Sequence, residues 1–223
     1  MAIICVGGMI SLGKSSMAKL LGETLESEVF YESVDNNPVL ERFYTASKEE
    51  AEAERLTFLL QLWFLNTRFD SIKRALIHSH NVLDRSIYED IYFMKRNQQY
   101  GRLIGENRIT DLEETIYMGL FENMMEELEE LPKKSPDLMV YLKGSFETVI
   151  KRIKQRGREF ELDEKLVEYY RFLWEKYDEW VMKHYKASEV LIIEVDNLDY
   201  VHNESDKEYV VKLVKEKLEE LGI

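Results

Sequence analysis

Hydrophobic positions along this chain follow two alternating patterns. Five short apolar runs, bounded by polar or turn residues, occur at 2–6, 28–31, 81–83, 138–142 and 190–195. Longer stretches with helical spacing separate them. Short buried strands that alternate with helices are typical of parallel sheets, so we expect an α/β fold with five parallel strands and helices on both faces. No linker-like stretch interrupts the pattern, and residues 1–223 are expected to form one domain.

The helical stretches differ in how they distribute their apolar residues. Residues 54–65 are apolar on nearly every side, which predicts a helix buried between layers or covered by a partner subunit. In residues 111–131, apolar positions recur every four residues, and glutamates between 126 and 130 fill the other side as a solvated face. The aromatic run 169–180 predicts core or interface packing, and residues 206–221 predict an amphipathic helix.

Composition narrows the class of protein. The chain is 45% hydrophobic, but its apolar runs are far shorter than a membrane span, and no basic region precedes the first one. We therefore expect a cytoplasmic protein. The single cysteine, Cys5, excludes an intrachain disulfide and is expected in the core of the first strand.

Net charge restricts the partners. A net charge of −13 disfavours nucleic acid polymers and anionic membranes. One basic segment, residues 151–158, holds five basic residues and no acid. Arg152 and Arg156 share one helix face, and Arg158 follows Gly157, a candidate hinge. Guanidinium groups in this arrangement can clamp a triphosphate, although a solvated basic helix end remains an alternative for the lysines of the segment.

The most specific motif is a phosphate-binding loop between the first apolar run and the first helix. Its residues are Gly8, Met9, Ile10, Ser11, Leu12, Gly13, Lys14 and Ser15, followed by Ser16. Gly8 and Gly13 allow backbone N–H groups to turn toward phosphate oxygens at a helix N-terminus. Lys14 can reach the β- and γ-phosphates, and the Ser15 hydroxyl can bind Mg²⁺. A nucleoside triphosphate, expected to be ATP, is the predicted ligand.

Two carboxylates follow predicted strands. Asp84 ends the third apolar run, where open parallel sheets bind their ligands, so it can hold Mg²⁺ together with Ser15. The alternative for Asp84 is to cap the next helix. Glu32 ends the second run and can accept a proton from an attacking hydroxyl, although position alone also fits a surface residue.

Five motifs in order give the chain a resemblance to a known family. They are Gly-x-x-x-x-Gly-Lys-Ser-Ser at 8–16, Phe-Tyr-Glu-Ser-Val-Asp-x-Asn-Pro-Val-Leu at 30–40, Leu-Leu-Gln-Leu-x-Phe-Leu-Asn-Thr-Arg-Phe at 59–69, Asn-Val-Leu-Asp-Arg-Ser-Ile-Tyr-Glu-Asp at 81–90 and Lys-Arg-Ile-x-x-Arg-Gly-Arg at 151–158. Together they resemble the deoxyribonucleoside kinases, in particular the bacterial deoxyadenosine/deoxyguanosine kinases, which have a P-loop NTPase fold.

The resemblance implies roles around the acceptor. Glu32 would take the proton of the 5′-hydroxyl, and Arg85 would hold that hydroxyl and the carboxylate. Gln61 would bind the edge of the base. Arg68 and Asp90 would shape the base pocket, as in members that accept purines and deoxycytidine; deoxyadenosine is the first expectation, with deoxyguanosine and deoxycytidine as alternatives.

It also implies how the sugar and the donor are held. Tyr44 and Glu161 would contact the 3′-hydroxyl, and residues 196–200 would lie near the donor adenine. Lys14 and the arginines of a lid at about 151–161 would neutralise the transferring phosphoryl group, with Mg²⁺ as the metal. The family also implies a homodimer built through helices near 55–75 and 111–131.

The chain departs from the family pattern in three ways. Residues 45–55 form a longer segment than in close relatives, which bears on the position of Tyr44. Met9, Ile10 and Leu12 are bulkier than is usual in the loop, and Ser33 replaces a proline common in animal members; we expect both changes to be harmless.

Two other functions fit the loop. A nucleoside monophosphate kinase would need arginines for the acceptor phosphate, whereas carboxylates dominate this candidate pocket. A non-catalytic nucleotide-binding subunit would usually have lost Lys14 or Glu32. A GTPase is disfavoured because no Asn-Lys-x-Asp motif occurs.

Overall fold

Five parallel strands form the centre of the fold. The computed structural model describes residues 2–34, 36–75, 80–129 and 135–223. The strands are β1 (Ala2–Gly8), β2 (Glu28–Phe30), β3 (His80–Asp84), β4 (Leu138–Lys143) and β5 (Glu189–Glu194). Their order is β2-β3-β1-β4-β5, and all neighbours are parallel. The predicted five-stranded parallel sheet is confirmed, and each apolar run overlaps one strand.

The central position of β1 decides where the site lies. All seven of its residues are buried, as expected for a strand with a neighbour on each side. In the register of the sheet, Val6 pairs with Asp84 of β3 and Gly8 pairs with Leu142 of β4. The carboxyl ends of β1 and β3 therefore meet, which brings the phosphate loop next to Asp84.

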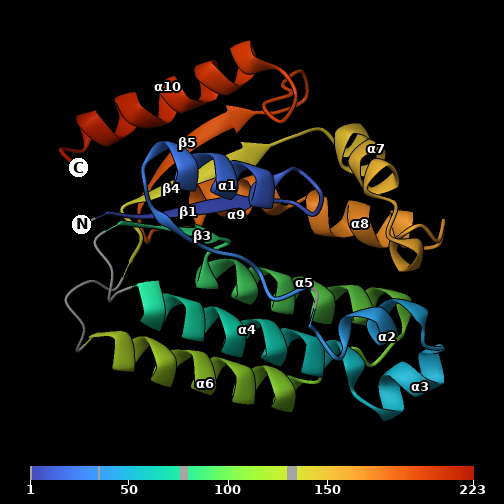
Figure 1. Cartoon of the computed structure of the whole chain (residues 1–223). Helices are drawn as coiled ribbons and strands as arrows, with labels where there is room; N and C mark the ends of the chain where they lie inside the picture. The colour runs from blue at the N-terminus through green and yellow to red at the C-terminus, as the bar shows by residue number, and fades with distance from the viewer. Residues whose placement is uncertain (1, 35, 76–79, 130–134) are drawn as a thin grey trace.

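Helices cover both faces of the sheet (Figure 1). They are α1 (Lys14–Thr24), α2 (Leu40–Thr45), α3 (Lys48–Ala53), α4 (Leu56–Ala75), α5 (Ile87–Ile104), α6 (Asp111–Glu129), α7 (Phe146–Arg156), the 3₁₀ turn η1 (Glu159–Glu161), α8 (Leu166–Trp174), α9 (Tyr177–Lys183) and α10 (Glu204–Glu220). In Figure 1, α10 lies above the sheet, and α4, α5 and α6 lie below it. Residues 130 and 131 of the predicted helix 111–131 lie outside the described residues.

Helix α4 is packed on most of its sides. It contacts α5, α6 and β3, and its buried residues include Leu60, Leu65 and Ile72. The polar side chains Gln61 and Arg68 are buried on the same helix. Leu59, in contrast, is 42% exposed. The prediction of a helix buried between layers is therefore confirmed for most of α4, with one apolar side left open.

Segment 45–55, which we expected to be longer than in close relatives, includes a short helix that is anchored to α6. Ser47 caps α3, with reciprocal bonds to Glu50. Arg55, which follows α3, donates to Glu113 of α6 (Nε–Oε1 2.7 Å) and to the Asn107 carbonyl (2.8 Å). The segment thus joins α2, which carries Tyr44, to the helical layer below the sheet.

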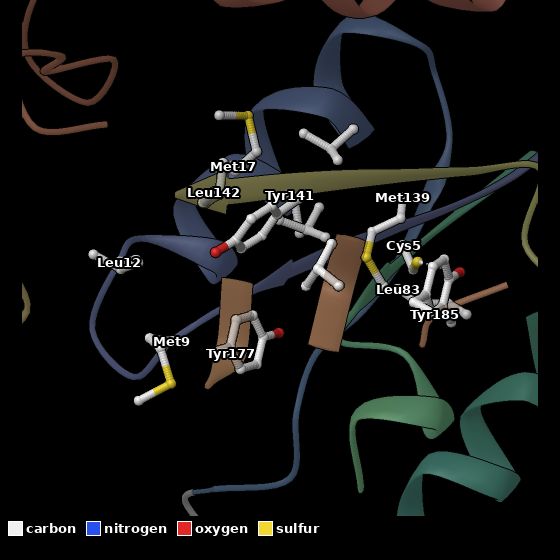
Figure 2. Close-up of a cluster of buried hydrophobic side chains, with 14 of the residues drawn as sticks. Cys5, Met9, Leu12, Met17, Leu83, Met139, Tyr141, Leu142, Tyr177 and Tyr185 are labelled. Carbon is white, nitrogen blue, oxygen red and sulfur yellow. Dashed lines mark hydrogen bonds between the residues drawn. The ribbon is translucent and has the colours of Figure 1, made fainter. Parts of the chain in front are cut away.

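Aromatic side chains from residues 169–180 pack in the core, as predicted. Tyr177 lies edge-on to Tyr92, with ring centroids 5.1 Å apart, and Trp180 packs against both. Figure 2 shows Tyr177 near Met9, whereas Cys5 and Tyr185 lie together at the other side of the view. The Cys5 thiol is fully buried 3.8 Å from the Tyr185 hydroxyl, and burial raises its pKa.

Among the described residues, no helix has the length and apolar character needed to cross a membrane.

Candidate active site

The phosphate loop joins β1 to α1 and holds its lysine inside. Gly13 precedes α1 with φ of 95°, and Ser11 also has positive φ, at 62°. The Lys14 Nζ lies 3.0 Å from the Met9 carbonyl. Burial and the nearby Arg85 guanidinium lower the pKa of Lys14 to about 8. The loop thus presents a cationic end to the cavity in front of it.

Of the three bulky loop residues, Met9 and Leu12 are buried away from the cavity, and Ile10 lines it. Met9 and Leu12 are each 1% exposed and belong to the hydrophobic core. Gly13 lies directly against the Tyr200 hydroxyl, which leaves no room for a Cβ at this position unless that side chain moves. Bulk in the loop therefore anchors it, and the expectation of a harmless change fits the geometry.

Ser15 and Asp84 come together as predicted. The Ser15 hydroxyl donates to Asp84 Oδ2 at 2.5 Å, while Oδ1 is buried without a hydrogen-bond partner among the described residues. Burial and the nearby Glu32 carboxylate raise the pKa of Asp84. An orphaned carboxylate oxygen beside a hydroxyl provides the hard oxygen ligands that Mg²⁺ prefers. The alternative role is not seen, because Ser86 caps α5.

Glu32 forms ion pairs with two arginines. Its Oε1 lies 3.1 Å from Arg85 Nε and 2.9 Å from Arg68 Nη2. Burial favours the protonated acid, but Arg85, Arg68 and Lys14 outweigh it and lower the pKa of Glu32 to about 2. Glu32 is therefore ionised at neutral pH. Arg85 reaches it from a backbone with positive φ, 80°, directly after β3.

Arg68 also binds Asp90, one turn into α5. Its Nε lies 2.7 Å from Asp90 Oδ2, and its Nη1 donates to the Asp84 carbonyl at 2.9 Å. Burial raises the pKa of Asp90 to about 6, although Arg68 opposes the shift. The guanidinium thus ties Glu32, β3 and α5 together from behind the pocket.

A cavity of about 390 Å³ brings most of the predicted site residues together. The predicted residues that line it are Ile10, Ser11, Gly13, Lys14, Ser15, Ser16, Glu32, Tyr44, Gln61, Arg85, Asp90, Arg152, Arg156, Arg158 and Glu161. Five predicted residues do not line it: Gly8, Met9, Leu12, Arg68 and Asp84. Of these, Arg68 and Asp84 contact the lining residues directly, and the rest belong to the phosphate loop.

The cavity also has walls that the sequence did not predict. Leu60 and Phe64 line it beside Gln61 on α4, and Phe93 and Asn97 line it from α5. Tyr169, which was assigned only to packing, lines it too and donates its hydroxyl to Asn97 at 2.9 Å. Spacing of three to four residues along α4 and α5 is the signal that could have revealed these positions.

The basic segment does not act as three free cations in this structure. Arg152 donates to the Leu12 carbonyl (2.7 Å) and to the Val195 carbonyl (2.8 Å), so it braces the phosphate loop. Arg156 and Arg158 both pair with Glu161, Arg158 at 3.6 Å. Gly157 ends α7 with φ of 70°, which suits the predicted hinge.

A second cavity, of about 770 Å³, also borders the phosphate loop. Five residues are shared with the first cavity: Ser11, Gly13, Ser16, Arg152 and Arg156. Its remaining walls include Thr148, Gln155 and residues 196–202. The predicted donor segment 196–200 therefore lies next to the loop, with Tyr200 donating to the Gly13 carbonyl at 3.1 Å.

Known proteins are similar to this chain in sequence. A family model described as deoxynucleoside kinase matches residues 4–219. The chain is 44% identical to the deoxyguanosine kinase of Lactobacillus acidophilus over all of this chain and 93% of that protein. It is 41% identical to the deoxyadenosine kinase of the same organism, over 99% of this chain and 98% of that one.

A solved structure agrees with these relatives. The structure of deoxyadenosine kinase from M. mycoides with bound dATP matches with a TM-score of 0.75 at 27% identity, covering 96% of this chain and 99% of that chain. Since the family match spans nearly the whole sequence, the alternatives of a monophosphate kinase and of a non-catalytic subunit are not supported. The chain belongs to the deoxynucleoside kinase family and is an ATP-dependent deoxynucleoside kinase of nucleotide salvage.

Proposed function

We propose that this kinase transfers the γ-phosphoryl group of ATP to the 5′-hydroxyl of a purine 2′-deoxynucleoside. The observation that carries the proposal is the buried Gln61 amide at the wall of a cavity that also holds Glu32. An amide offers one donor and one acceptor, which complement the N6 amino group and a ring nitrogen of adenine. Guanine can pair with the same amide after it rotates. The relatives named deoxyguanosine kinase and deoxyadenosine kinase support either purine.

We place deoxyadenosine first because Asp90 lines the same cavity. A carboxylate accepts a hydrogen bond from an amino group and repels a carbonyl oxygen such as guanine O6. Arg68 donates to Asp90, Glu32 and the Asp84 carbonyl, so its donors are directed to protein groups. Deoxycytidine, with an amino group at its edge, is the next candidate.

The chain's own groups then have distinct tasks. Glu32, ionised and held by Arg85 and Arg68, accepts the proton of the 5′-hydroxyl while the 5′-oxygen of the nucleoside forms a bond to the γ-phosphorus of ATP. The bond between the γ-phosphorus and the oxygen that bridges it to the β-phosphate breaks, and ADP leaves. Lys14 and the backbone of residues 8–16 hold the phosphates, which is mainly positioning and charge stabilisation. Ser15 and Asp84 would hold Mg²⁺, which neutralises phosphate charge when bound.

Three further roles are proposed on the resemblance and on placement in the cavity. Tyr44 and Glu161, both lining the cavity, would contact the sugar 3′-hydroxyl. Residues 151–161 would act as a lid, with Arg156 and Arg158 reaching the phosphates once Glu161 turns to the sugar. The donor adenine would lie near residues 196–200 in the second cavity.

The direct test is a competition assay that offers all four deoxynucleosides, and deoxyadenosine monophosphate as a separate acceptor, with ATP and Mg²⁺. The expected result is phosphorylation of deoxyadenosine first and deoxyguanosine second, with no transfer to the monophosphate. Preferred use of thymidine would refute the proposed base recognition. Omitting Mg²⁺ should abolish turnover, and full activity in excess chelator would refute the metal.

We also propose a homodimer through α4 and α6. Leu59 of α4 and Leu112, Ile116 and Leu120 of α6 are large apolar side chains exposed by 39 to 69%. Exposed apolar side chains on adjacent helices are typical of a protein interface. Sedimentation should give a dimer at micromolar concentration, and Ile116→Glu should give a monomer. A monomeric unsubstituted chain would contradict this proposal.

We propose one folding domain and a cytoplasmic location. The sheet interleaves early and late segments, because β1 lies between β3 and β4. Unfolding should therefore show a single cooperative transition by two independent probes. Two separate transitions would contradict one domain, and recovery of the activity outside the cytosolic fraction would contradict the location.

A further inference from the structure

A buried carboxylate that has no place in the proposed chemistry lies directly behind the site. Glu89, in the first turn of α5, is 0% exposed. Its Oε1 lies 2.9 Å from Arg85 Nη1 and also accepts the Tyr177 hydroxyl. Its Oε2 accepts the Ser86 amide at 2.8 Å, which forms part of the α5 cap. The charge of Glu89 is therefore matched by Arg85, the arginine that contacts Glu32.

Glu89, Tyr177 and Arg85 also contact Gly8, the first glycine of the phosphate loop. The Gly8 amide donates to the Tyr177 hydroxyl at 3.0 Å and approaches Glu89 Oε1 at 3.4 Å. The Gly8 carbonyl accepts from Arg85 Nη1 at 3.0 Å. Both backbone polar groups of Gly8 are thus bound by side chains. Its Cα also faces the Leu142 carbonyl so closely that a Cβ would lie 2.8 Å from that oxygen.

These contacts connect the two substrates' sites by a short covalent and hydrogen-bonded path. Gly8 begins the loop that holds the donor phosphates, and Arg85 extends from Gly8 and Glu89 to Glu32 Oε1. A shift of Gly8 relative to Arg85 would change the separation between the donor phosphate and Glu32, the residue that accepts the proton. Phosphoryl transfer depends strongly on such positioning, and small displacements reduce rates by large factors.

We propose that Glu89 and Tyr177 are positioning residues that fix the phosphate loop and Arg85 relative to each other. They thereby hold the donor phosphate and the acceptor hydroxyl at the separation that phosphoryl transfer requires. This inference rests on the proposed roles of Arg85 and Glu32. Tyr177 supplies the contact from α9, which is distant in sequence from the loop and from α5. The sequence predicted only a packing role for the aromatic run that contains Tyr177, whereas its hydroxyl here has a positioning role.

Tyr177→Phe is the most informative variant, because it keeps the ring packing and leaves the α5 cap intact. Tyr185→Phe is the matched control: Tyr185 is also a buried tyrosine, and its hydroxyl contacts Cys5 and Ser188 away from the loop (Figure 2). We expect Tyr177→Phe to lower kcat roughly tenfold, as loss of a hydrogen bond to a charged group implies, with the KM for deoxyadenosine within about twofold. Tyr185→Phe should keep the kcat of the unsubstituted enzyme.

A double-mutant cycle separates positioning from stability. If Tyr177 acts through Arg85 and Glu32, Tyr177→Phe should cost less than about twofold in kcat when Glu32 is already replaced by Gln. A merely structural role would give the same factor in both backgrounds. Glu89→Gln, which keeps the shape but removes the charge, should lower kcat further than Tyr177→Phe, with melting temperatures recorded for every variant.

Equal kcat for Tyr177→Phe and Tyr185→Phe, or equal factors in the two backgrounds, would overturn the inference. Failure of the proposed function is a different result. In that case the unsubstituted chain would phosphorylate none of the purine deoxynucleosides, whereas failure of this inference leaves an active enzyme that is indifferent to Tyr177.

Discussion

The two halves of the proposed site, the donor half for ATP and the acceptor half for the deoxynucleoside, are formed by different parts of the chain. In the proposed function, the donor half is one contiguous loop, residues 8–16, whose backbone and single lysine would hold the phosphates. The acceptor half is a cluster of side chains from α4, from α5 and from the residues that follow β2 and β3, including Glu32, Arg68, Arg85 and Asp90. A backbone site recognises phosphate in any nucleotide, whereas a side-chain cluster can select one hydroxyl and one base.

The electrostatics of the two halves differ accordingly. The pKa of Lys14 is lowered to about 8, mainly because its side chain is buried. Glu32 has a lowered pKa of about 2 because Arg85, Arg68 and Lys14 surround it. The arginines and carboxylates of the acceptor half thus pair with one another, whereas Lys14 is the single charged side chain of the loop. Substitutions in the two halves should therefore affect binding and turnover differently.

The largest effect should come from Glu32→Gln. Loss of the proton acceptor should lower kcat about a thousandfold, while ATP affinity stays within about twofold because the loop is untouched. Single-turnover rates and ATP titration measure the two quantities. Glu41→Gln, a change of the same chemistry at an exposed position on α2, is the control and should retain full turnover. Near-normal turnover of Glu32→Gln would refute the assignment of the base.

Gln61→Leu should have the next largest effect. Removing the amide leaves the base edge unpaired in a buried pocket, so kcat/KM for deoxyadenosine should fall about a hundredfold. ATP affinity should not change, which would sharpen the division between the two halves. Steady-state kinetics with deoxyadenosine and with thymidine would test this, and an equal loss for both nucleosides would argue against base recognition by Gln61.

A smaller effect should appear with pH at Asp90. Its pKa of about 6 means that the carboxylate becomes protonated as the pH falls through 6, and it then loses its attraction for Arg68 and for a base amino group. The KM for deoxyadenosine should therefore rise several-fold between about pH 7 and pH 5. Asp90→Asn should have a higher KM without this inflection, and an unchanged inflection would assign the titration to another group.

The smallest effect should be on ATP binding at alkaline pH. Because the pKa of Lys14 is about 8 in the free protein, the ammonium loses its proton above that pH, and the affinity for ATP should weaken by a few fold between about pH 7 and pH 9. Calorimetry in buffers of different ionisation enthalpy should also detect proton uptake on binding. Lys14→Arg stays charged and should show a flat profile. Equal pH dependence in both proteins would contradict this role for Lys14.

The donor half was predictable from sequence because its residues are adjacent along the chain. Glycine spacing and the preceding strand placed Lys14 and Ser15, and the end of the third strand placed Asp84, since parallel strands end at one edge of a sheet. Even in this half, the sequence did not reveal that Arg152 binds the backbone carbonyls of Leu12, Val195 and Leu198. The direction of a long side chain depends on tertiary contacts that spacing does not contain.

The acceptor half was predictable only as far as the resemblance reached. Gln61, Asp90, Tyr44 and Glu161 line one cavity as expected, but Asn97, Phe93 and Tyr169 were missed. The positions of Glu89 and Tyr177 were likewise not predicted, because their contact joins two residues that are 88 positions apart in the sequence. No local pattern distinguishes a buried carboxylate with partners from an ordinary acid of a first helical turn.

The burial of Cys5 has a practical consequence for following this enzyme at work. Its thiol lies inside β1 and stays protonated, so it should not react with maleimide or iodoacetamide reagents in the folded protein. A cysteine introduced by Lys154→Cys, at an exposed position on α7, would then carry a fluorophore at one defined place without removal of any native residue. The basic segment, residues 151–158, can therefore be labelled for spectroscopy in a chain that keeps its native cysteine.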